Sequence, residues 1–293
     1  MADRGNVLVT GASSGIGEAC ARRLDAEGFR VFAGVRRHED GERLRQGTSR
    51  LTPVMLDVTD GASIAAAAAA IEADTTAAGL VGLVNNAGVA IAGPLEYLPL
   101  DLLRRQLDVN VTGQVAVTQA FLPLLRRSTG RLVFIGSISG RVAAPILGPY
   151  SASKFAIGAI CDALRVELSP WGLHVSLVEP GDIATPIWDK GLADGDALAA
   201  QMPEIARQRY GPLIAAIRRV AEHSARGGAP TSAVADVVFR ALTASKPKTR
   251  YLVGSDAKAR AWVARLPDRW RDALLTRSLR LPTHAGHEAP EGG

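Results

Sequence analysis

The chain has 293 residues, enough to bury a large core, and its 47% hydrophobic and 22% charged residues are ordinary for a globular protein. The net charge of +5 comes without zinc-finger spacing or a basic run interleaved with aromatics, which argues against nucleic-acid binding. The histidines are scattered and Cys20 and Cys161 form no ligand pair, so we expect no metal site and two buried thiols. The chain shows no signal-peptide pattern and no apolar run of about 18 residues, and we expect a cytoplasmic protein.

Short β-branched runs alternate with longer helical patterns, which predicts a parallel sheet built from βαβ units. The candidate strands are residues 6–10, 30–35, 52–56, 80–85, 131–136, 174–178 and 250–253. The candidate helices are residues 17–27, 39–46, 63–78, 101–125, 149–168 and 231–245. Several strands are continuous apolar runs, as expected when helices cover both faces of a sheet. We therefore predict a single doubly wound α/β domain with a seven-stranded parallel sheet over residues 1–255.

A glycine-rich turn, Thr-Gly-Ala-Ser-Ser-Gly-Ile-Gly at residues 10–17, follows the first candidate strand and opens the first helix. Glycines at such a turn let the backbone approach a pyrophosphate, and the helix N-terminus offers unpaired N–H groups and a positive dipole end. A strand before the turn and a helix after it are the context of a Rossmann-type dinucleotide site. The alternative is a glycine-rich turn without a ligand.

The residues at the end of the second strand discriminate between the two nicotinamide dinucleotides. An acidic residue there suits the ribose hydroxyls of NAD, and a basic residue suits the 2′-phosphate of NADP. This chain has Arg36 and Arg37 at that place, and guanidinium groups bind phosphate in a bidentate manner. We expect NADP to be preferred over NAD, the alternative being two solvated arginines on a loop.

Tyr150 and Lys154 lie one helical turn apart, in the sequence Tyr-Ser-Ala-Ser-Lys. A phenol has a reference pKa near ~10, and an adjacent ammonium together with a positively charged nicotinamide would favour the phenolate. Ser137 follows a buried strand, where its hydroxyl can bond a substrate oxygen. Asn110 lies within an apolar helix and needs partners there. Each residue alone also has an ordinary structural explanation.

Together, these residues resemble the short-chain dehydrogenases/reductases in order and spacing, over roughly residues 5–255. The matching residues are those of the turn at 10–17, Asp57-Val58, Asn85-Asn86-Ala87-Gly88, Asn110, Ser137, Tyr150 to Lys154, and Pro180-Gly181 followed by Thr185. Residues 250–278 are similar to the retinol and hydroxysteroid dehydrogenase branch. The resemblance implies an oxidoreductase that moves a hydride between NADP(H) and an alcohol or ketone carbon.

The resemblance also assigns roles to single residues. Tyr150 would be the general acid/base, Lys154 would lower its pKa and bind the nicotinamide ribose, and Ser137 would steady the substrate oxygen. Asn110 would hold a water in the proton relay. The implied cofactor contacts are Gly11, Ser13, Ser14, Gly15, Ile16, Gly17, Arg36, Arg37, Asp57, Val58, Asn86, Ala87, Gly88, Tyr150, Lys154, Pro180, Gly181, Ile183 and Thr185. Ser14 is a departure, because NADP-preferring members often have a basic residue there.

Residues 186–228 break the strand–helix alternation just after the turn that would bracket the nicotinamide, so we expect a substrate lid there. The apolar residues of this stretch are Ile187, Trp188, Leu192, Leu198, Met202, Tyr210, Leu213, Ile214 and Ile217. If some of them line the pocket, the substrate is lipophilic, such as a steroid, a retinoid or a long-chain compound. The alternatives are a 3-oxoacyl reductase and a dinucleotide-binding sensor without catalysis.

Residues 256–293 follow the last candidate strand as a helical extension and a polar tail. The basic segment 261–281 contains Trp262 and Trp270 and is suited to an anionic membrane surface. Packing against its own domain or a partner subunit is the alternative. By analogy with the family, we expect a homo-oligomer.

Overall fold

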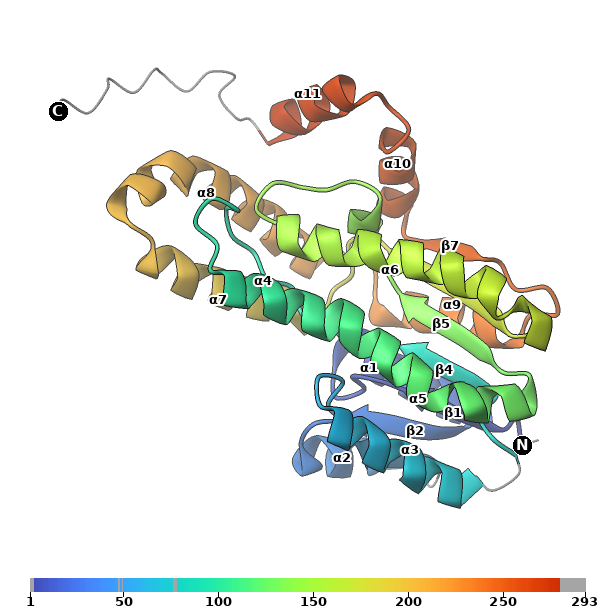
Figure 1. The fold of residues 1–293 in the computed structure, drawn as a ribbon. Coiled ribbons are helices and arrows are strands. Elements are labelled where there is room, and N and C mark those ends of the chain that lie inside the picture. Colours follow the sequence, from blue (N-terminus) through green and yellow to red (C-terminus); the bar gives the residue numbers. More distant parts are fainter. Residues whose placement is uncertain (1–2, 47, 49, 76–77, 280–293) are drawn as a thin grey trace.

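The computed structural model describes residues 3–46, 48, 50–75 and 78–279. In this part of the chain, seven parallel strands form one sheet in the order β3-β2-β1-β4-β5-β6-β7 (Figure 1). The strands are β1 Asn6–Val9, β2 Arg30–Val35, β3 Leu51–Met55, β4 Gly82–Asn85, β5 Arg131–Ile135, β6 His174–Pro180 and β7 Arg250–Val253. The predicted fold class and the seven-stranded sheet are confirmed, with strand ends shifted by no more than two residues.

Two hydrophobic clusters cover the two faces of the sheet. One cluster is closed by α1 Gly15–Ala26, α2 His38–Arg45 and α9 Thr231–Thr243. The other is closed by α3 Gly61–Thr75, α5 Gly113–Ser128 and α6 Gly148–Glu167. Alternate residues of β1 belong to opposite clusters, Val7 and Val9 to the first and Leu8 to the second. This is why three successive residues of β1 are apolar. The predicted burial of Cys20 and Cys161 is confirmed.

The position of β1 creates the crevice in which a doubly wound sheet binds its ligand. β1 pairs with β2 on one side and with β4 on the other. The strands that follow β1 in the chain are therefore added first on one side of it, as β2 and β3, and then on the other side, from β4 onwards. Connections at such a switch point leave opposite faces of the sheet, and a gap opens at the carboxyl ends of the strands.

The single helix expected at 101–125 is not regular, which corrects that prediction. The structure has α4 Leu100–Leu107, then a π-type turn at Asp108–Thr112, then α5. A π turn adds one residue to the helical turn and is often found at functional sites. Asn110 lies within it and is fully buried, so the widened turn accommodates a polar side chain that must find its partners inside the protein.

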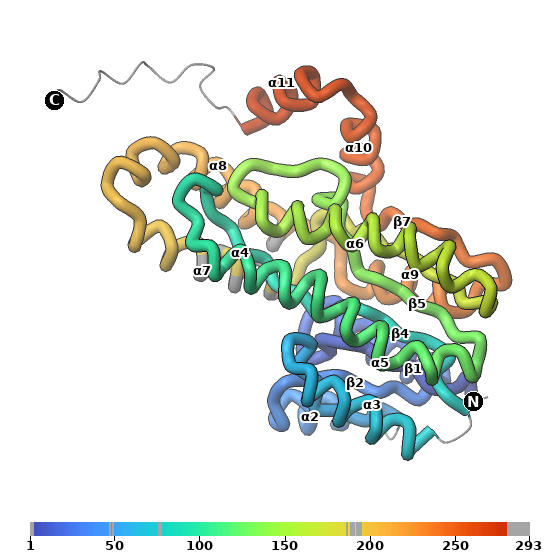
Figure 2. The backbone as a smooth tube through the Cα atoms, viewed as in Figure 1, coloured from blue at the N-terminus to red at the C-terminus, as the bar shows by residue number. Residues whose placement is uncertain are grey.

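The stretch expected to form the lid folds as two helices, α7 Pro186–Gln201 and α8 Glu204–Gly227. Both lie at the end of the molecule where α4 begins (Figures 1 and 2). The lid residues buried in the structure are Leu198, Met202 and Ile217. The side chains of Trp188 and Leu192 lie outside the described part of the chain.

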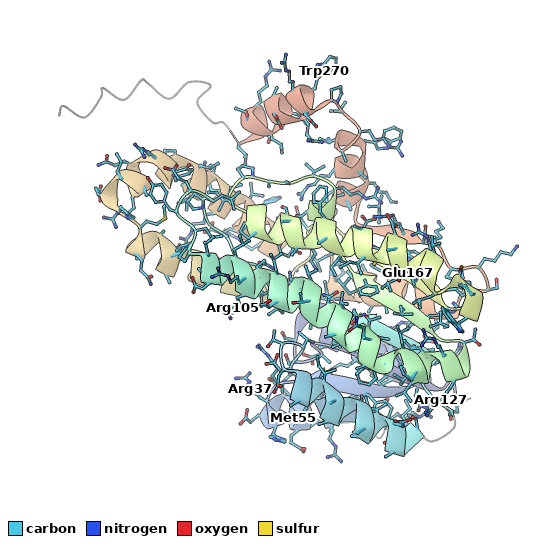
Figure 3. All side chains as sticks on the ribbon, in the orientation of Figure 1. Arg37, Met55, Arg105, Arg127, Glu167 and Trp270 are labelled. Carbon is cyan, nitrogen blue, oxygen red and sulfur yellow. The ribbon has the colours of Figure 1, made fainter. Side chains whose placement is uncertain are left out.

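The C-terminal part of the described chain forms α10 Ser255–Val263 and α11 Asp268–Ser278. Trp262 and Trp270 are each 69% exposed, and Figure 3 shows Trp270 on α11, away from the sheet. Contact of this region with a membrane or a second copy of the chain stays a prediction. No helix among the described residues has the length and apolarity needed to cross a bilayer. The polar tail lies outside them.

Candidate active site

A cavity of about 610 Å³ lies at the carboxyl ends of the strands, a size typical of small-molecule and cofactor sites. The predicted site residues that line it are Gly11, Ser13, Ser14, Gly15, Ile16, Gly17, Arg36, Asp57, Val58, Asn86, Ala87, Gly88, Ser137, Tyr150, Lys154, Pro180, Gly181, Ile183 and Thr185. The fold thus brings the glycine turn, the catalytic candidates and the turn after β6 to one cavity. Two predicted residues, Arg37 and Asn110, are not part of its lining.

The glycine turn presents bare backbone to this cavity at the start of α1. Ser14 stands at the N-cap of α1 and makes no side-chain capping bond, so the first N–H groups of the helix have no capping side chain. A Cβ atom at Gly17 would stand 2.2 Å from the Gly11 carbonyl oxygen and 2.4 Å from Nδ2 of Asn86. Only glycine fits there, and the helix N-terminus is open to an anion. These residues fit the pyrophosphate of a nicotinamide dinucleotide.

Side-chain hydrogen bonds fix the turn against the end of β4. Oγ1 of Thr10 accepts the backbone N–H groups of Asn86 and Ala87, each at 3.0 Å. Nδ2 of Asn86 donates to the carbonyl oxygens of Thr10 and Gly11 at 2.9 and 3.1 Å. The two strand ends that flank the switch point are therefore held in a fixed geometry before any ligand binds.

Arg36 lies at the end of β2 and lines the cavity beside Asp57. Burial acts to raise the pKa of the Asp57 carboxyl, but hydrogen bonds from the backbone and hydroxyl of Thr59 and the charge of Arg36 lower it. Oδ1 of Asp57 accepts both Thr59 bonds, at 2.9 and 2.7 Å. An ionised, oriented carboxylate and a guanidinium thus stand at the adenosine end expected for the cofactor.

Arg37 does not join Arg36 in the lining of the cavity, and its contact with the cofactor stays a prediction. Its side chain is 72% exposed and pairs with Asp40 of α2 at 3.0 Å. Figure 3 shows Arg37 at the outer side of the molecule. The physical reason is the extended backbone of Arg37 at the N-cap of α2, since successive side chains of extended chain point to opposite sides.

The predicted catalytic residues Ser137, Tyr150 and Lys154 meet where α6 passes the end of β5. Lys154 is 5% exposed, and its Nζ donates to the Ile135 carbonyl oxygen at 2.8 Å. The same Nζ lies 5.6 Å from the ring centroid of Tyr150. Burial raises the pKa of Tyr150, and a hydrogen bond with Ser137 opposes the rise. The expected lowering of the phenol pKa is therefore not found in the protein alone, and a phenolate needs a further positive charge in the cavity.

Burial also lowers the pKa of Lys154, from 10.5 to about 8. Because the unfolded chain holds this proton more tightly, the charged lysine costs the folded state about 3 kcal/mol at pH 7. Lys154→Met removes this cost but also removes the hydrogen bond to the Ile135 carbonyl, which contributes about 1 kcal/mol. We therefore expect the variant to raise the free energy of unfolding by about 2 kcal/mol at pH 7.

The sign of this effect follows from proton binding. Between pH 8 and about 10.5 the unfolded state carries a proton that the folded state lacks, so the wild type gains stability as pH rises and the advantage of Lys154→Met disappears. Urea unfolding of the wild type and of Lys154→Met at pH 7 and pH 10 measures this difference in stability. Lys246→Met, at an exposed lysine, is the control. An equal difference at both pH values would contradict the assignment.

Three buried amides hold the segment that follows β4. Nδ2 of Asn110 donates to the Val89 carbonyl at 3.0 Å and to Oγ of Ser153 at 3.1 Å, and its Oδ1 accepts the Val89 N–H at 2.8 Å. Gln106 bonds the same segment from α4, and Gln114 from α5. The Asn110 side chain therefore acts as a structural clamp between this segment and α6. Its role as a water holder stays a prediction.

A buried carboxylate network behind the catalytic residues was not predicted. Glu179, the residue before Pro180, has a side chain only 1% exposed and receives two bonds from Arg141 at 2.7 and 2.6 Å. Arg250 of β7 bridges Glu179 at 3.2 Å and Asp162 of α6 at 2.7 Å. The network joins the segment after Ser137, the end of β6 and the catalytic helix. The sequence gives no signal for it, because its members come from distant positions.

Two further features of the cavity were missed. Asp101, Arg104 and Arg105 of α4 and Asp108 of the following π-type turn line it. Their i, i+3, i+4, i+7 spacing marks one helix face and is visible in the sequence. In addition, α10 supports the turn after β6. Oδ2 of Asp256 accepts the N–H of Asp182 at 2.8 Å, and Arg260 pairs with the Asp182 carboxylate at 2.7 Å. The C-terminal extension thus contacts the edge of the site.

Comparison with known proteins agrees with this geometry. A family model described as short chain dehydrogenase matches residues 5–194. The chain is 37% identical over 283 residues to an NADPH-dependent 3-dehydrocapnine reductase of Ornithobacterium rhinotracheale, covering 94% of this chain and 98% of that protein. It is 39% identical to retinol dehydrogenase 5 of Homo sapiens, covering 95% of this chain and 90% of that protein.

A solved structure gives the same result at the level of the fold. A short chain dehydrogenase from Burkholderia cenocepacia in complex with NADP superimposes with a TM-score of 0.69 and 28% identity, over 94% of this chain and 98% of that one. We conclude that this chain belongs to the short-chain dehydrogenase family, near its retinol dehydrogenase branch, and is a nicotinamide-dependent oxidoreductase.

Proposed function

We propose that this protein uses NADPH to reduce the ketone group of a lipophilic molecule. The observation that carries the proposal is the arrangement of one cavity, which has Tyr150, Lys154 and Ser137 at one part and Arg36 with the bare glycine turn at another. The intact catalytic set favours an enzyme over a silent dinucleotide sensor, since a binder has no need of a buried lysine beside a phenol.

In the reduction, the phenol of Tyr150 donates a proton to the carbonyl oxygen, and the Ser137 hydroxyl donates a hydrogen bond to the same oxygen. When bound, the nicotinamide supplies the hydride to the carbonyl carbon. The ammonium of Lys154, held by the Ile135 carbonyl, then stabilises the phenolate that remains. A proton from solvent restores the phenol, and the ketone leaves as an alcohol.

Two observations support the preferred cofactor and substrate. At the end of β2, the charged residue that lines the cavity is Arg36 and not an acidic residue. The similar reductase of Ornithobacterium rhinotracheale is named as NADPH-dependent. Beyond the catalytic residues, the cavity is lined by Ile187 and Gly191 of α7. An apolar lid over the carbonyl favours a lipophilic ketone over a sugar or a small polar acid. We take residues 186–228 as this lid.

Arg36→Asp is expected to weaken NADPH binding by about 10- to 150-fold, since a charge-assisted contact to phosphate contributes about 1.5–3 kcal/mol. The new carboxylate suits the ribose hydroxyls of NADH, whose affinity should be unchanged or higher. Nicotinamide fluorescence titrations with both dinucleotides measure the two constants. Arg37→Asp makes the same change at the neighbour that lies outside the cavity, and its preference should stay that of the wild type.

The wild-type titration comes first and is followed by ketone-dependent oxidation of NADPH with a panel of steroid, retinoid and acyl ketones. Tighter binding of NADH than of NADPH by the wild type would overturn the cofactor proposal. Equal loss of NADPH affinity in both arginine variants would show a general charge effect. Turnover restricted to 3-oxoacyl thioesters would assign the protein to that alternative.

A further inference from the structure

A second, smaller cavity of about 40 Å³ lies inside the lid, between α7, α8 and the segment before α4. We call it the lid chamber. Its apolar walls are Ala92, Pro94, Ile146, Leu198, Ala199, Met202, Ile214 and Ile217. Four of these side chains are at least 92% buried: Ile146, Leu198, Met202 and Ile217. A buried space with such walls excludes polar ligand groups and suits hydrocarbon.

Gly191 is the residue that lines both the lid chamber and the catalytic cavity. A Cβ atom there would stand 3.2 Å from the carbonyl oxygen of Ala90, which also lines the catalytic cavity. A side chain at this position would therefore stand at the boundary between the two spaces. Glycine in the interior of a helix costs about 0.5–1 kcal/mol relative to alanine, so α7 leaves this boundary without a side chain against its own helix propensity.

Gly195 provides an internal comparison. It lies one turn further along α7 and lines only the lid chamber, and a Cβ atom there would meet nothing within 4 Å. The two glycines therefore share their helical setting but differ in what a side chain would obstruct.

The wall nearest the catalytic helix contains a strained residue. Ile146 has a φ of 65°, which is rare for a β-branched side chain, and lies four positions before Tyr150. Such a backbone costs on the order of 1–3 kcal/mol and persists where the surroundings enforce it. Here the Ile146 carbonyl accepts the N–H of Gly93 at 2.8 Å, which joins the chamber wall to the chain just before the reacting tyrosine.

The lining of the chamber also includes one pair of charged residues. Arg218 of α8 and Asp196 of α7 both line the chamber and form an ion pair across the two helices. A hydrocarbon chain that enters past Gly191 would therefore also meet polar groups in the chamber. Because one water-sized group needs about 10–15 Å³ of such volume, the chamber holds about three methylene groups.

We propose that the lid chamber binds the unbranched aliphatic tail of the substrate, which enters past Gly191 while its carbonyl lies at Tyr150. This inference rests on the proposed ketone reduction and narrows its substrate class. A flexible chain fits an opening of glycine width and a volume of three methylenes, whereas a fused ring system does not.

The test is a ladder of unbranched 2-alkanones from butanone to dodecanone, with kcat/KM measured for each at saturating NADPH. Each methylene that enters the chamber should raise kcat/KM about fourfold, and the rise should stop after about three methylenes in the series. Gly191→Leu should remove this rise, about 60-fold for the longest ketones. Ile214→Phe, which fills the chamber from within, should do the same.

Gly191→Ala and Gly195→Ala form the matched pair, since both replace a glycine of α7 by the best helix former. Only Gly191→Ala should reduce the length dependence. A ladder without length dependence in the wild type, or an equal response of the two alanine variants, would overturn the chamber proposal while ketone reduction stands.

Binding without turnover is measured separately, as the rise in melting temperature of the NADPH complex with each ketone. If no ketone is reduced but longer ketones stabilise the wild type and not Gly191→Leu, the chamber stands and the proposed reaction fails. If neither turnover nor stabilisation depends on the chain length of the ketone, the chamber proposal fails.

Discussion

Tyr150→Phe is expected to lower kcat by about 10²- to 10⁴-fold, because it removes the proton donor and leaves the ring in place. Lys154 keeps its bond to the Ile135 carbonyl, which does not involve the phenol oxygen, and the glycine turn is untouched. Affinity for NADPH should therefore stay within about threefold of the wild type. Steady-state kinetics and nicotinamide fluorescence measure the two quantities.

Ser137→Ala is the companion variant for this prediction. The Ser137 side chain forms a hydrogen bond with the phenol of Tyr150 and accepts the Ser139 N–H at 3.1 Å. Loss of the bond to the phenol should also raise the pH at which kcat of the reduction falls to half its maximum. The direction follows because the hydrogen bond lowers the pKa of Tyr150. Retention of full activity by Tyr150→Phe would refute the assignment of the general acid.

Glu179→Gln should cause the largest loss of stability, about 3 kcal/mol or more in the free energy of unfolding. The carboxylate is almost fully buried, and its removal leaves the guanidinium groups of Arg141 and Arg250 without their shared counter-charge. Both arginines keep about 30% of their exposed area, so water compensates part of the loss and the upper end of the usual range, about 5 kcal/mol, is not expected. Urea unfolding at pH 7 measures the change.

An exposed pair in the same region serves as the control. Arg165 and Asp162 form an i,i+3 ion pair with side chains 36% and 45% exposed, so Arg165→Gln should cost less than about 1 kcal/mol. In a double-mutant cycle, Arg141→Met and Glu179→Gln together should cost less than the sum of the single changes, since each single change already removes the interaction between the two side chains. Additive losses would show that the two side chains do not act as one buried pair.

Much of the site was predictable because its signals are local. The glycine turn, the Tyr150–Lys154 spacing and the apolar strands follow from the geometry of neighbouring residues, and the sheet brings their ends together by the rule that parallel strands share a carboxyl edge. The residues placed by this rule line one cavity in the structure.

The sequence does not show the direction of a side chain where that direction depends on packing. Arg36 and Arg37 are adjacent and chemically identical, yet one lines the cavity and the other pairs with Asp40. The extended backbone at the start of α2 makes that choice. Asn110 likewise lies inside the protein because a π turn replaces part of the expected helix. The hydrophobic periodicity of the sequence does not predict this turn.

The sequence by itself determined the fold class and the family and predicted the reacting groups, since each rests on motifs of residues close together in the chain. Only the tertiary structure decided what those groups face. The Glu179 network joins residues from four distant segments, and the lid chamber exists only where α7 and α8 pack on the segment before α4. Such features arise from long-range packing, which places Gly191 at the boundary of two cavities that the sequence alone does not show.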